Sequence, residues 1–258
     1  MTAVRVRLLG TPGAESPDKP LRIPRRQVRA LLYYLAEQEE RTAREGLCFL
    51  FWPDRPESRA RRHLSSLLSH LRRALPEPNL LVITHEHVAL HATRVWTDCR
   101  CFRTLTTSTS GKPLSPAALS QAVKLYRDPF LAGFSLPGCP EFEMWASVQR
   151  RHWERRYLET LETLVRMQEA QGNLEDAIGH ARRYLETDEL AEHIHRDLIR
   201  LHAAAGDHRA ASEQYEQCAV LLERELGVSP LPETQAVYQA AQQGRVRARS
   251  TAPSPTWT

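Results

Sequence analysis

The chain has 258 residues, enough for two domains of ordinary size, and its 41% hydrophobic and 26% charged residues are typical of a folded protein. No apolar run approaches the roughly 20 residues of a membrane-spanning helix, and the first residues lack the apolar core of a secretion signal, so we expect neither membrane insertion nor export. The net charge of +4 combines a basic stretch, residues 1–112 with 19 basic and 11 acidic residues, and an acidic stretch, residues 113–258 with 16 and 20, a division that favours contact of the first half with a polyanion.

The first residues predict short β-strands. Residues 4–9 alternate apolar and basic side chains up to Gly10, where a turn rich in Pro and Gly begins. Residues 21–23 form a second, shorter alternating run. We therefore expect a hairpin or a small N-terminal sheet.

Three helices are predicted next. The first covers residues 25–40, where apolar residues recur at helical spacing. The second covers residues 42–50, because Thr42 stands three residues before Glu45, the spacing of a capping box. The third covers residues 57–75 and follows a loop that contains two prolines.

A second hairpin is predicted after the third helix. Two apolar runs, residues 80–83 and 88–91, flank His85-Glu86-His87. Strands, three helices and a hairpin, in this order, are the arrangement of a winged helix-turn-helix. We expect residues 1–103 to form such a DNA-binding domain.

Residues 104–116 are rich in Ser, Thr, Gly and Pro and are expected to be a linker. Helical periodicity dominates the chain after it. Helices are predicted over residues 115–127 and 141–171, and four more follow, broken at 173, near 188, at 206–207 and at 227–230.

The C-terminal half also contains an internal repeat. Ala170-Gln171-Gly172-Asn173 recurs as Ala204-Ala205-Gly206-Asp207, an offset of 34 residues, which is the period of the tetratricopeptide (TPR) repeat. We expect residues 117–243 to form an all-α helical-repeat domain and residues 244–258 to be a disordered tail. The predicted fold class is mainly α with a small β component.

The predicted third helix has an apolar face and a basic face. At 100° per residue, Ala60 and five leucines share one side, which we expect to be buried. No acidic residue lies between Arg59 and Arg73. Arginine binds guanine edges bidentately, and serine or histidine fits into the major groove. We expect DNA bases to be read by Arg59, Arg62, Ser65, Ser66, Ser69, His70 and Arg73. The alternative is the solvated basic face of a surface helix, although such helices usually mix both charge signs.

Other residues are expected to contact the DNA backbone. Two arginines begin the first helix, where backbone amides favour phosphate, and a threonine and an arginine begin the second. The histidines at the tip of the hairpin are compatible with a DNA contact and equally with an exposed turn. These candidates are Arg25, Arg26, Thr42, Arg44, His85 and His87.

No catalytic, metal-binding or cofactor-binding motif is evident. His85, His87 and His91 alternate along a predicted hairpin, but no cysteine or carboxylate completes a zinc site. Residues 110–112 (Ser-Gly-Lys) resemble the end of a P-loop without its upstream glycine or its following Ser or Thr. The five cysteines form no CxxC pair, which is typical of a reducing compartment. We expect a cytoplasmic protein, associated with the nucleoid when bound to DNA, without enzyme activity, metal or cofactor.

Several stretches resemble the Streptomyces antibiotic regulatory protein (SARP) family, in which an OmpR-like winged helix precedes a bacterial transcriptional activator domain (BTAD). The likeness extends from about Val4 to Gln243. It includes RRQVRALLYYLA at 25–36, FLFWPD at 49–54, SRARRHLSSLLSHLRRAL at 58–75, VWTDCRCF at 95–102 and LYRDPFLAGFSLPGCPEFEMW at 125–145.

The resemblance implies a bacterial activator that binds direct repeats in a promoter, often as side-by-side protomers. In such proteins the loop between the second and third helices contacts RNA polymerase. Here this loop is Trp52, Pro53, Asp54, Arg55 and Pro56, for which a purely structural role is the alternative. The sequence departs from the family pattern at Cys48 and Phe49.

Two other functions remain compatible with the sequence. One is a TPR-type protein-interaction adaptor in which the basic helix has no role. The other is the N-terminal regulatory part of a larger signalling ATPase, because large relatives continue into such a domain.

Overall fold

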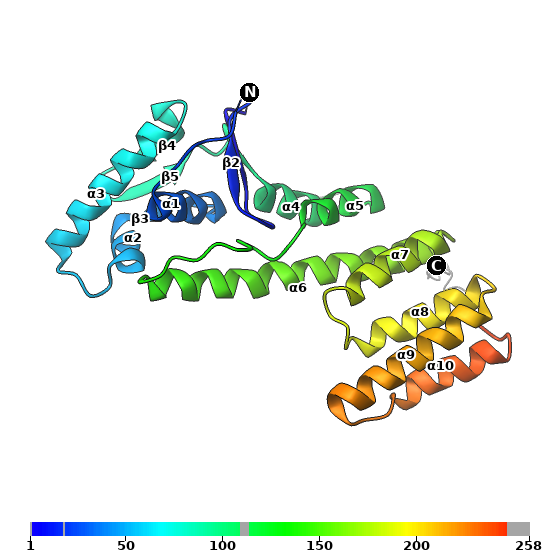
Figure 1. Ribbon diagram of the computed structural model, residues 1–258. Coiled ribbons are helices and arrows are strands. Elements are labelled where there is room, and N and C mark those ends of the chain that lie inside the picture. Colours follow the sequence, from blue (N-terminus) through cyan, green and yellow to red (C-terminus); the bar gives the residue numbers. More distant parts are fainter. Residues whose placement is uncertain (1, 18, 109–113, 247–258) are drawn as a thin grey trace, which may run out of the picture. The chain divides into compact units, whose positions relative to one another are not determined.

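The computed structural model of the protein describes residues 2–17, 19–108 and 114–246 (Figure 1). The chain divides into two compact units: residues up to 114 with 121–156, and residues 115–120 with those from 157 onward. Residues 109–113 of the expected linker, which include the P-loop-like Ser-Gly-Lys, and residues 247–258 of the expected tail lie outside the described residues. The division into domains at 103, 116 and 243 stays a prediction.

The first unit begins with a three-stranded sheet. Its strand order is β2 (Gly13–Glu15), β1 (Val4–Arg7), β6 (Val95–Thr97), with β1 antiparallel to β2 and parallel to β6. The prediction of a strand at residues 21–23 was wrong. The chain turns back at Gly10 and pairs with β1 at once through residues 13–15, so Leu21 contributes only a backbone hydrogen bond to Ala14, of 2.8 Å.

Three helices and a second sheet complete the winged-helix arrangement that the sequence predicts. The helices are α1 (Arg26–Glu37), α2 (Arg44–Phe51) and α3 (Glu57–Ala74), and α3 packs against both others. After a 3-10 turn, η1 (Pro78–Leu80), the sheet runs in the order β3 (Thr42–Ala43), β5 (His87–Leu90), β4 (Leu81–Ile83). The β4–β5 hairpin was predicted; β3 was not.

The expected capping box of Thr42 and Glu45 is not formed. Thr42 pairs with Val88 in β3, and the backbone amide of Arg44 donates to the carbonyl of Glu86 at 2.8 Å. Ala43, whose side chain makes no capping hydrogen bond, is the N-cap of α2. The prediction was wrong because sheet pairing places Thr42 outside the helix by one residue.

A buried carboxylate joins the first strand to α4 (Asp98–Thr106), which extends into the expected linker. Asp98 accepts hydrogen bonds from the backbone amides of Leu8, Leu9 and Cys99 at 2.8–3.0 Å, and Arg127 lies 3.6 Å away. Burial raises the pKa of Asp98, against these hydrogen bonds. The side chain thereby fixes the end of β1 against the helix.

A second buried carboxylate, Glu37, connects α1 to α4. Arg103 donates to its side chain and to its carbonyl, and the Arg103 guanidinium lies 5.0 Å from the Trp153 ring centroid. Trp153 belongs to α6 (Pro140–Ala170), whose residues contribute to both compact units. Burial outweighs the attraction of Arg103 and raises the pKa of Glu37 from 4.5 to about 7.

This pKa predicts a loss of stability with rising pH. Between about pH 4.5 and 7 the folded state holds a proton on Glu37 that the unfolded state releases, so the free energy of unfolding falls through this range, by about 3 kcal/mol in all. In Glu37→Gln this component is absent. Urea unfolding from pH 4 to 8, with the exposed Glu40→Gln as the control, measures the difference; parallel pH profiles for Glu37→Gln and wild type would contradict it.

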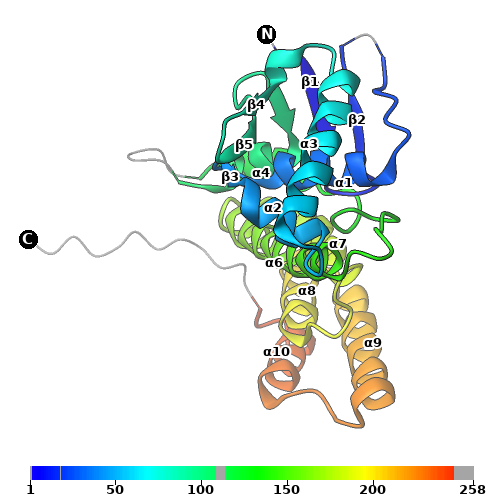
Figure 2. The same ribbon diagram turned by 90° about the vertical axis from the view of Figure 1, so that its left-hand side faces the viewer.

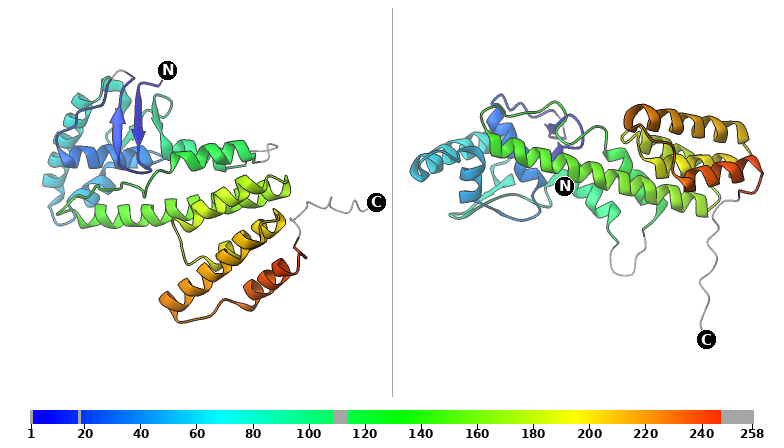
Figure 3. Two further views of the ribbon diagram at one scale, coloured as in Figure 1. Left: turned by 45° about the vertical axis from the view of Figure 1, so that its right-hand side comes forward. Right: turned by 90° about the horizontal axis from the view of Figure 1, so that it is seen from below.

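The second unit consists of α5 residues 116–120, the end of α6 and four helices (Figure 3). The full α5 is Pro116–Leu125, and the others are α7 (Leu174–Leu185), α8 (Glu192–Ala204), α9 (His208–Leu226) and α10 (Pro232–Gln242). All lie where helical periodicity predicted them.

The predicted repeat is visible in the backbone. Gly172 and Gly206, 34 residues apart, have φ angles of 79° and 82°, in the left-handed region. After each glycine the next amide donates backward over five residues, Asn173 to Gln168 and Asp207 to His202, both at 2.9 Å. The mainly α fold class and the 34-residue period are thus confirmed.

Substitution of a glycine in the repeat turn and of a glycine inside a helix is expected to change stability in opposite directions. Gly206→Ala is expected to destabilise the protein by about 1 kcal/mol, because a Cβ at positive φ is strained. Gly179→Ala, inside α7 where an added Cβ meets no atom within 4 Å, is expected to stabilise it by about 0.5–1 kcal/mol. Thermal unfolding of both variants measures the effects; the same sign in both would contradict the strained turn.

Candidate nucleic-acid interface

Helix α3 has the buried and exposed sides that the sequence predicts. Figure 2 shows this helix on the outside of the first unit. Its buried residues recur every three or four positions, which gives one apolar stripe and leaves the other side in solvent. The stripe consists of Ala60, Leu64, Leu67, Leu68 and Leu71.

The arginines predicted to read DNA are all on the solvent side. Arg59, Arg62 and Arg73 are exposed, and none forms an ion pair with a described residue. The Nε of Arg62 donates to the Ser58 carbonyl, and the Nε of Arg73 to the Ser69 carbonyl, at 3.3 and 3.4 Å. These bonds hold the side-chain stems to the helix. The terminal nitrogens are left to form the fork that matches a guanine edge or a phosphate.

The polar residues between the arginines are ordered by the helix backbone. The hydroxyls of Ser65 and Ser69 donate to the carbonyls four residues earlier, at 2.9 Å, and Ser66 is exposed. His70, partly buried, places Nδ1 2.6 Å from the Ser66 carbonyl. Because a carbonyl only accepts, Nδ1 carries a proton, and Nε2 is left for a hydrogen bond to another group. The serine oxygens can accept hydrogen bonds from base amino groups, and Nε2 of His70 can bond to a base edge.

The expected backbone contacts are distributed around α3. Arg44, at the start of α2, donates a hydrogen bond to the Ser65 hydroxyl at 3.2 Å, so it lies beside the solvent side of α3. Thr42 is partly buried in β3. At the hairpin tip His85 is exposed and His87 partly buried, and the Thr84 hydroxyl closes the turn by accepting from the His87 amide at 2.9 Å.

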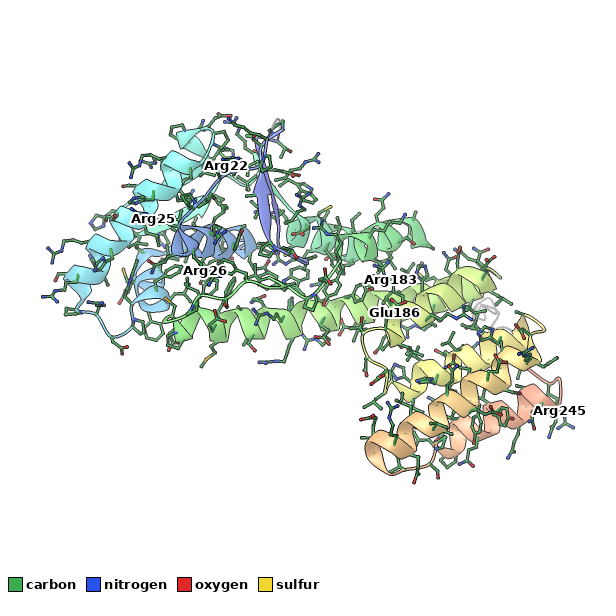
Figure 4. The ribbon with its side chains drawn as sticks, viewed as in Figure 1. Arg22, Arg25, Arg26, Arg183, Glu186 and Arg245 are labelled. Atoms are coloured by element: carbon green, nitrogen blue, oxygen red, sulfur yellow. The ribbon has the colours of Figure 1, made fainter. Side chains whose placement is uncertain are left out.

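Arg25 and Arg26 lie at the start of α1, and Arg22 precedes them in the same exposed segment (Figure 4). The first turn of α1 contains no acidic residue that would compete for an anion at its backbone amides. The Arg26 guanidinium lies 5.9 Å from the Phe134 ring centroid. Arg22 is not among the residues that the sequence predicts to contact the DNA backbone.

The solvent side of α3 contains three further cationic or titratable side chains that are not among the residues predicted from the sequence. Arg61 and Arg72 are exposed on α3, and Arg61 pairs with Glu57 at 2.5 Å. His63 is exposed beside Trp52, with ring centroids 5.5 Å apart. The charge count of α3 alone would have identified both arginines.

The loop between α2 and α3 has a packed part and an exposed part. Trp52 is half-buried between Phe51 and His63, with ring centroids 5.7 and 5.5 Å away. Pro53 is partly buried, and residues 54–56 are exposed. Trp52 therefore has a structural role whatever else the loop does, and the residues available to a partner are Asp54, Arg55 and Pro56.

Two other properties concern the described part of the chain only. Within it, no group of three or more His, Cys, Asp or Glu side chains is placed to hold a metal ion. None of its helices combines the length and apolar character needed to cross a bilayer.

Comparison with known proteins gives one family and a similar solved structure. The model of the bacterial transcriptional activator domain matches residues 98–242. The fold is similar to that of EmbR from Mycobacterium tuberculosis, solved in complex with a low-affinity phosphopeptide, with a TM-score of 0.68 and 18% identity. The match covers 94% of this chain and 66% of EmbR, so the chain spans less than two thirds of that protein. No curated protein sequence matches the chain.

Proposed function

The chain belongs to the bacterial transcriptional activator domain family and is a transcriptional regulator of the SARP type. We propose that it binds duplex DNA in a sequence-specific manner through α3. The observation that carries the proposal is the solvent side of this helix. It combines five arginines with serines and histidines, and its one acidic residue, Glu57, lies at the first position and is paired with Arg61. A helix side of this composition fits the major groove of duplex DNA, which is lined by negatively charged phosphates.

In the proposed complex the side chains of α3 divide into two kinds of contact. Arg59, Arg62, Ser65, Ser66, Ser69, His70 and Arg73 face the base edges. The backbone is held by Arg25, Arg26, Thr42 and Arg44 and by the hairpin histidines, His85 and His87. Phosphate contacts position the protein, and base contacts give it sequence preference.

The exposed half of the α2–α3 loop is proposed to contact RNA polymerase. Side-by-side protomers are proposed to occupy direct repeats in a promoter, and the protein is proposed to act in the cytoplasm. This part rests on membership of the family and on the exposure of Asp54, Arg55 and Pro56. Family membership and the arginine-rich α3 together favour a DNA-binding regulator over an adaptor in which the basic helix has no role.

Selection of bound sequences from random duplex DNA tests the proposal. We expect enrichment of a motif and an affinity that falls linearly on a logarithmic salt scale, with a slope of about −0.9 for each phosphate contact. The selected motif with its bases shuffled serves as the control duplex. No retardation of random duplex at low salt, or binding that salt does not weaken, would contradict DNA binding.

The single substitution Arg62→Ala separates base reading from phosphate contact. If Arg62 binds a base, we expect a loss of about 1–3 kcal/mol, confined to one position of the selected motif. The matched control is Arg209→Ala on α9, an exposed arginine that pairs with Glu213 at 2.8 Å. Equal weakening on all sequences with a flatter salt slope would instead assign Arg62 to a phosphate.

A further inference from the structure

A groove of about 910 Å³ runs along α7, α8 and α9 in the second unit. Helix α8 packs against both neighbours. Along α9 the lining extends from Ala210 to Arg224, about 21 Å at 1.5 Å per residue. This length accommodates about six residues of extended chain.

The charges that line the groove are mainly negative. Four glutamates, Glu186, Glu189, Glu213 and Glu216, face two arginines. Of these carboxylates only Glu213 forms an ion pair with a described residue, Arg209 on the exposed surface of α9. Glu186, at the end of α7, is labelled in Figure 4.

The two arginines of the groove already have partners. Arg182 donates to Nε2 of His202 at 3.5 Å, and Arg224 donates to Glu225 at 2.7 Å. Burial lowers the pKa of His202, with Arg182 adding to the shift, so this imidazole is neutral at pH 7. It therefore does not offset the carboxylates.

The polar lining includes a side-chain amide held in a fixed orientation. His195 is buried, and its Nε2 lies 2.9 Å from the Glu189 carbonyl, which only accepts, so Nε2 carries the proton. Nδ1 of this neutral ring then accepts from the Gln214 side-chain nitrogen at 2.7 Å. The Gln214 side-chain oxygen bonds to no other described residue. It is thus an oriented acceptor for a main-chain N–H.

Apolar side chains also line the groove. Leu185, Leu198 and Leu221 line the groove, and Val220 on α9 is 65% exposed. An exposed branched side chain within a groove provides a contact for an apolar side chain of a ligand. The lining therefore offers carboxylates, an amide acceptor and apolar surface within one groove.

We propose that this groove binds an extended segment of a partner protein in which arginine or lysine alternates with apolar residues. The unpaired carboxylates match basic side chains, the Gln214 amide matches the peptide backbone, and Val220 matches the apolar positions. A strand-like peptide presents such residues on alternate sides. The proposal is independent of DNA binding by α3.

Fluorescence anisotropy with the full chain tests this assignment. The probe is a labelled eight-residue peptide of alternating arginine and leucine, and the comparison peptide has glutamine in place of arginine. We expect the arginine peptide to bind, and the glutamine peptide to bind at least tenfold more weakly.

Two matched protein variants locate the binding. Glu186→Gln with Glu216→Gln is expected to weaken binding of the arginine peptide roughly five- to tenfold. Glu223→Gln with Glu233→Gln, which makes the same charge change at exposed positions outside the groove, is expected to leave it unchanged. Equal weakening in both variants, no binding of the arginine peptide, or equal binding of the glutamine peptide would overturn the proposal.

Discussion

Replacement of Arg59, Arg62 and Arg73 by alanine is expected to remove specific DNA binding. Each bidentate contact to a base is worth about 1–3 kcal/mol, so three lost contacts weaken binding by about 3–9 kcal/mol, a hundredfold or more. The fold should be unaffected, because all three side chains are exposed and none forms an ion pair within the described part of the chain. Titration of the selected duplex, with thermal unfolding of the same sample, measures both effects.

A matched variant controls for the loss of three positive charges. Arg166, Arg209 and Arg224 lie on helices of the second unit, each within 4 Å of a neighbouring glutamate. Their replacement by alanine changes the net charge by the same amount and is expected to alter affinity only slightly. If this variant lost binding as strongly as the α3 variant, the effect would be one of total charge, and α3 would not be the reading element.

The second large effect is expected for Asp98→Ala. The carboxylate, 1% exposed, accepts hydrogen bonds from the backbone amides of three buried residues, Leu8, Leu9 and Cys99. An unsatisfied buried donor costs about 1–3 kcal/mol, so the three together predict a loss of about 3–9 kcal/mol in the free energy of unfolding. This approaches the whole stability of a small domain.

Calorimetry of the full chain measures the Asp98→Ala effect. We expect the transition of the first unit to shift or vanish, with loss of DNA binding, while the helices of the second unit keep theirs. The exposed Asp128→Ala is the control. A change below about 1 kcal/mol in Asp98→Ala would mean that other groups or water replace the carboxylate as acceptor.

The sequence predicts well those elements that repeat their own pattern. Helix α3 and the helices of the second unit contain several turns each, so their apolar periodicity is visible in the residues alone. The glycines of the repeat mark its turns for the same reason. The family match agrees with the resemblance to SARP regulators drawn from the residues.

The missed elements are those fixed by contacts between distant residues. Strands β2, β3 and β6 have two or three residues, too few for a period. The hydrogen bonds from Leu8 and Leu9 to Asp98 connect residues that are 90 and 89 positions apart, which no local pattern contains. Thr42 illustrates a false prediction rather than a missed element. Its spacing to Glu45 is that of a capping box, but Thr42 pairs with Val88 in the sheet instead.

For the candidate site, the sequence predicts which residues face solvent but not how they are held. The exposed side of α3 follows from helical geometry. The contact of Arg44 with Ser65 depends on the angle between two helices, and the protonated nitrogen of His70 depends on a distance to a carbonyl. The DNA-contact roles of these residues remain predictions.

The twin turns at Gly172 and Gly206 have a consequence for chain length. Because both turns have nearly the same backbone angles and bonding, a duplicated block of residues 173–206 would start and finish in matching conformations. Such a copy adds one helical hairpin and leaves the flanking joints in register. The second unit can therefore be lengthened by whole repeats without a change in the conformation of its existing turns.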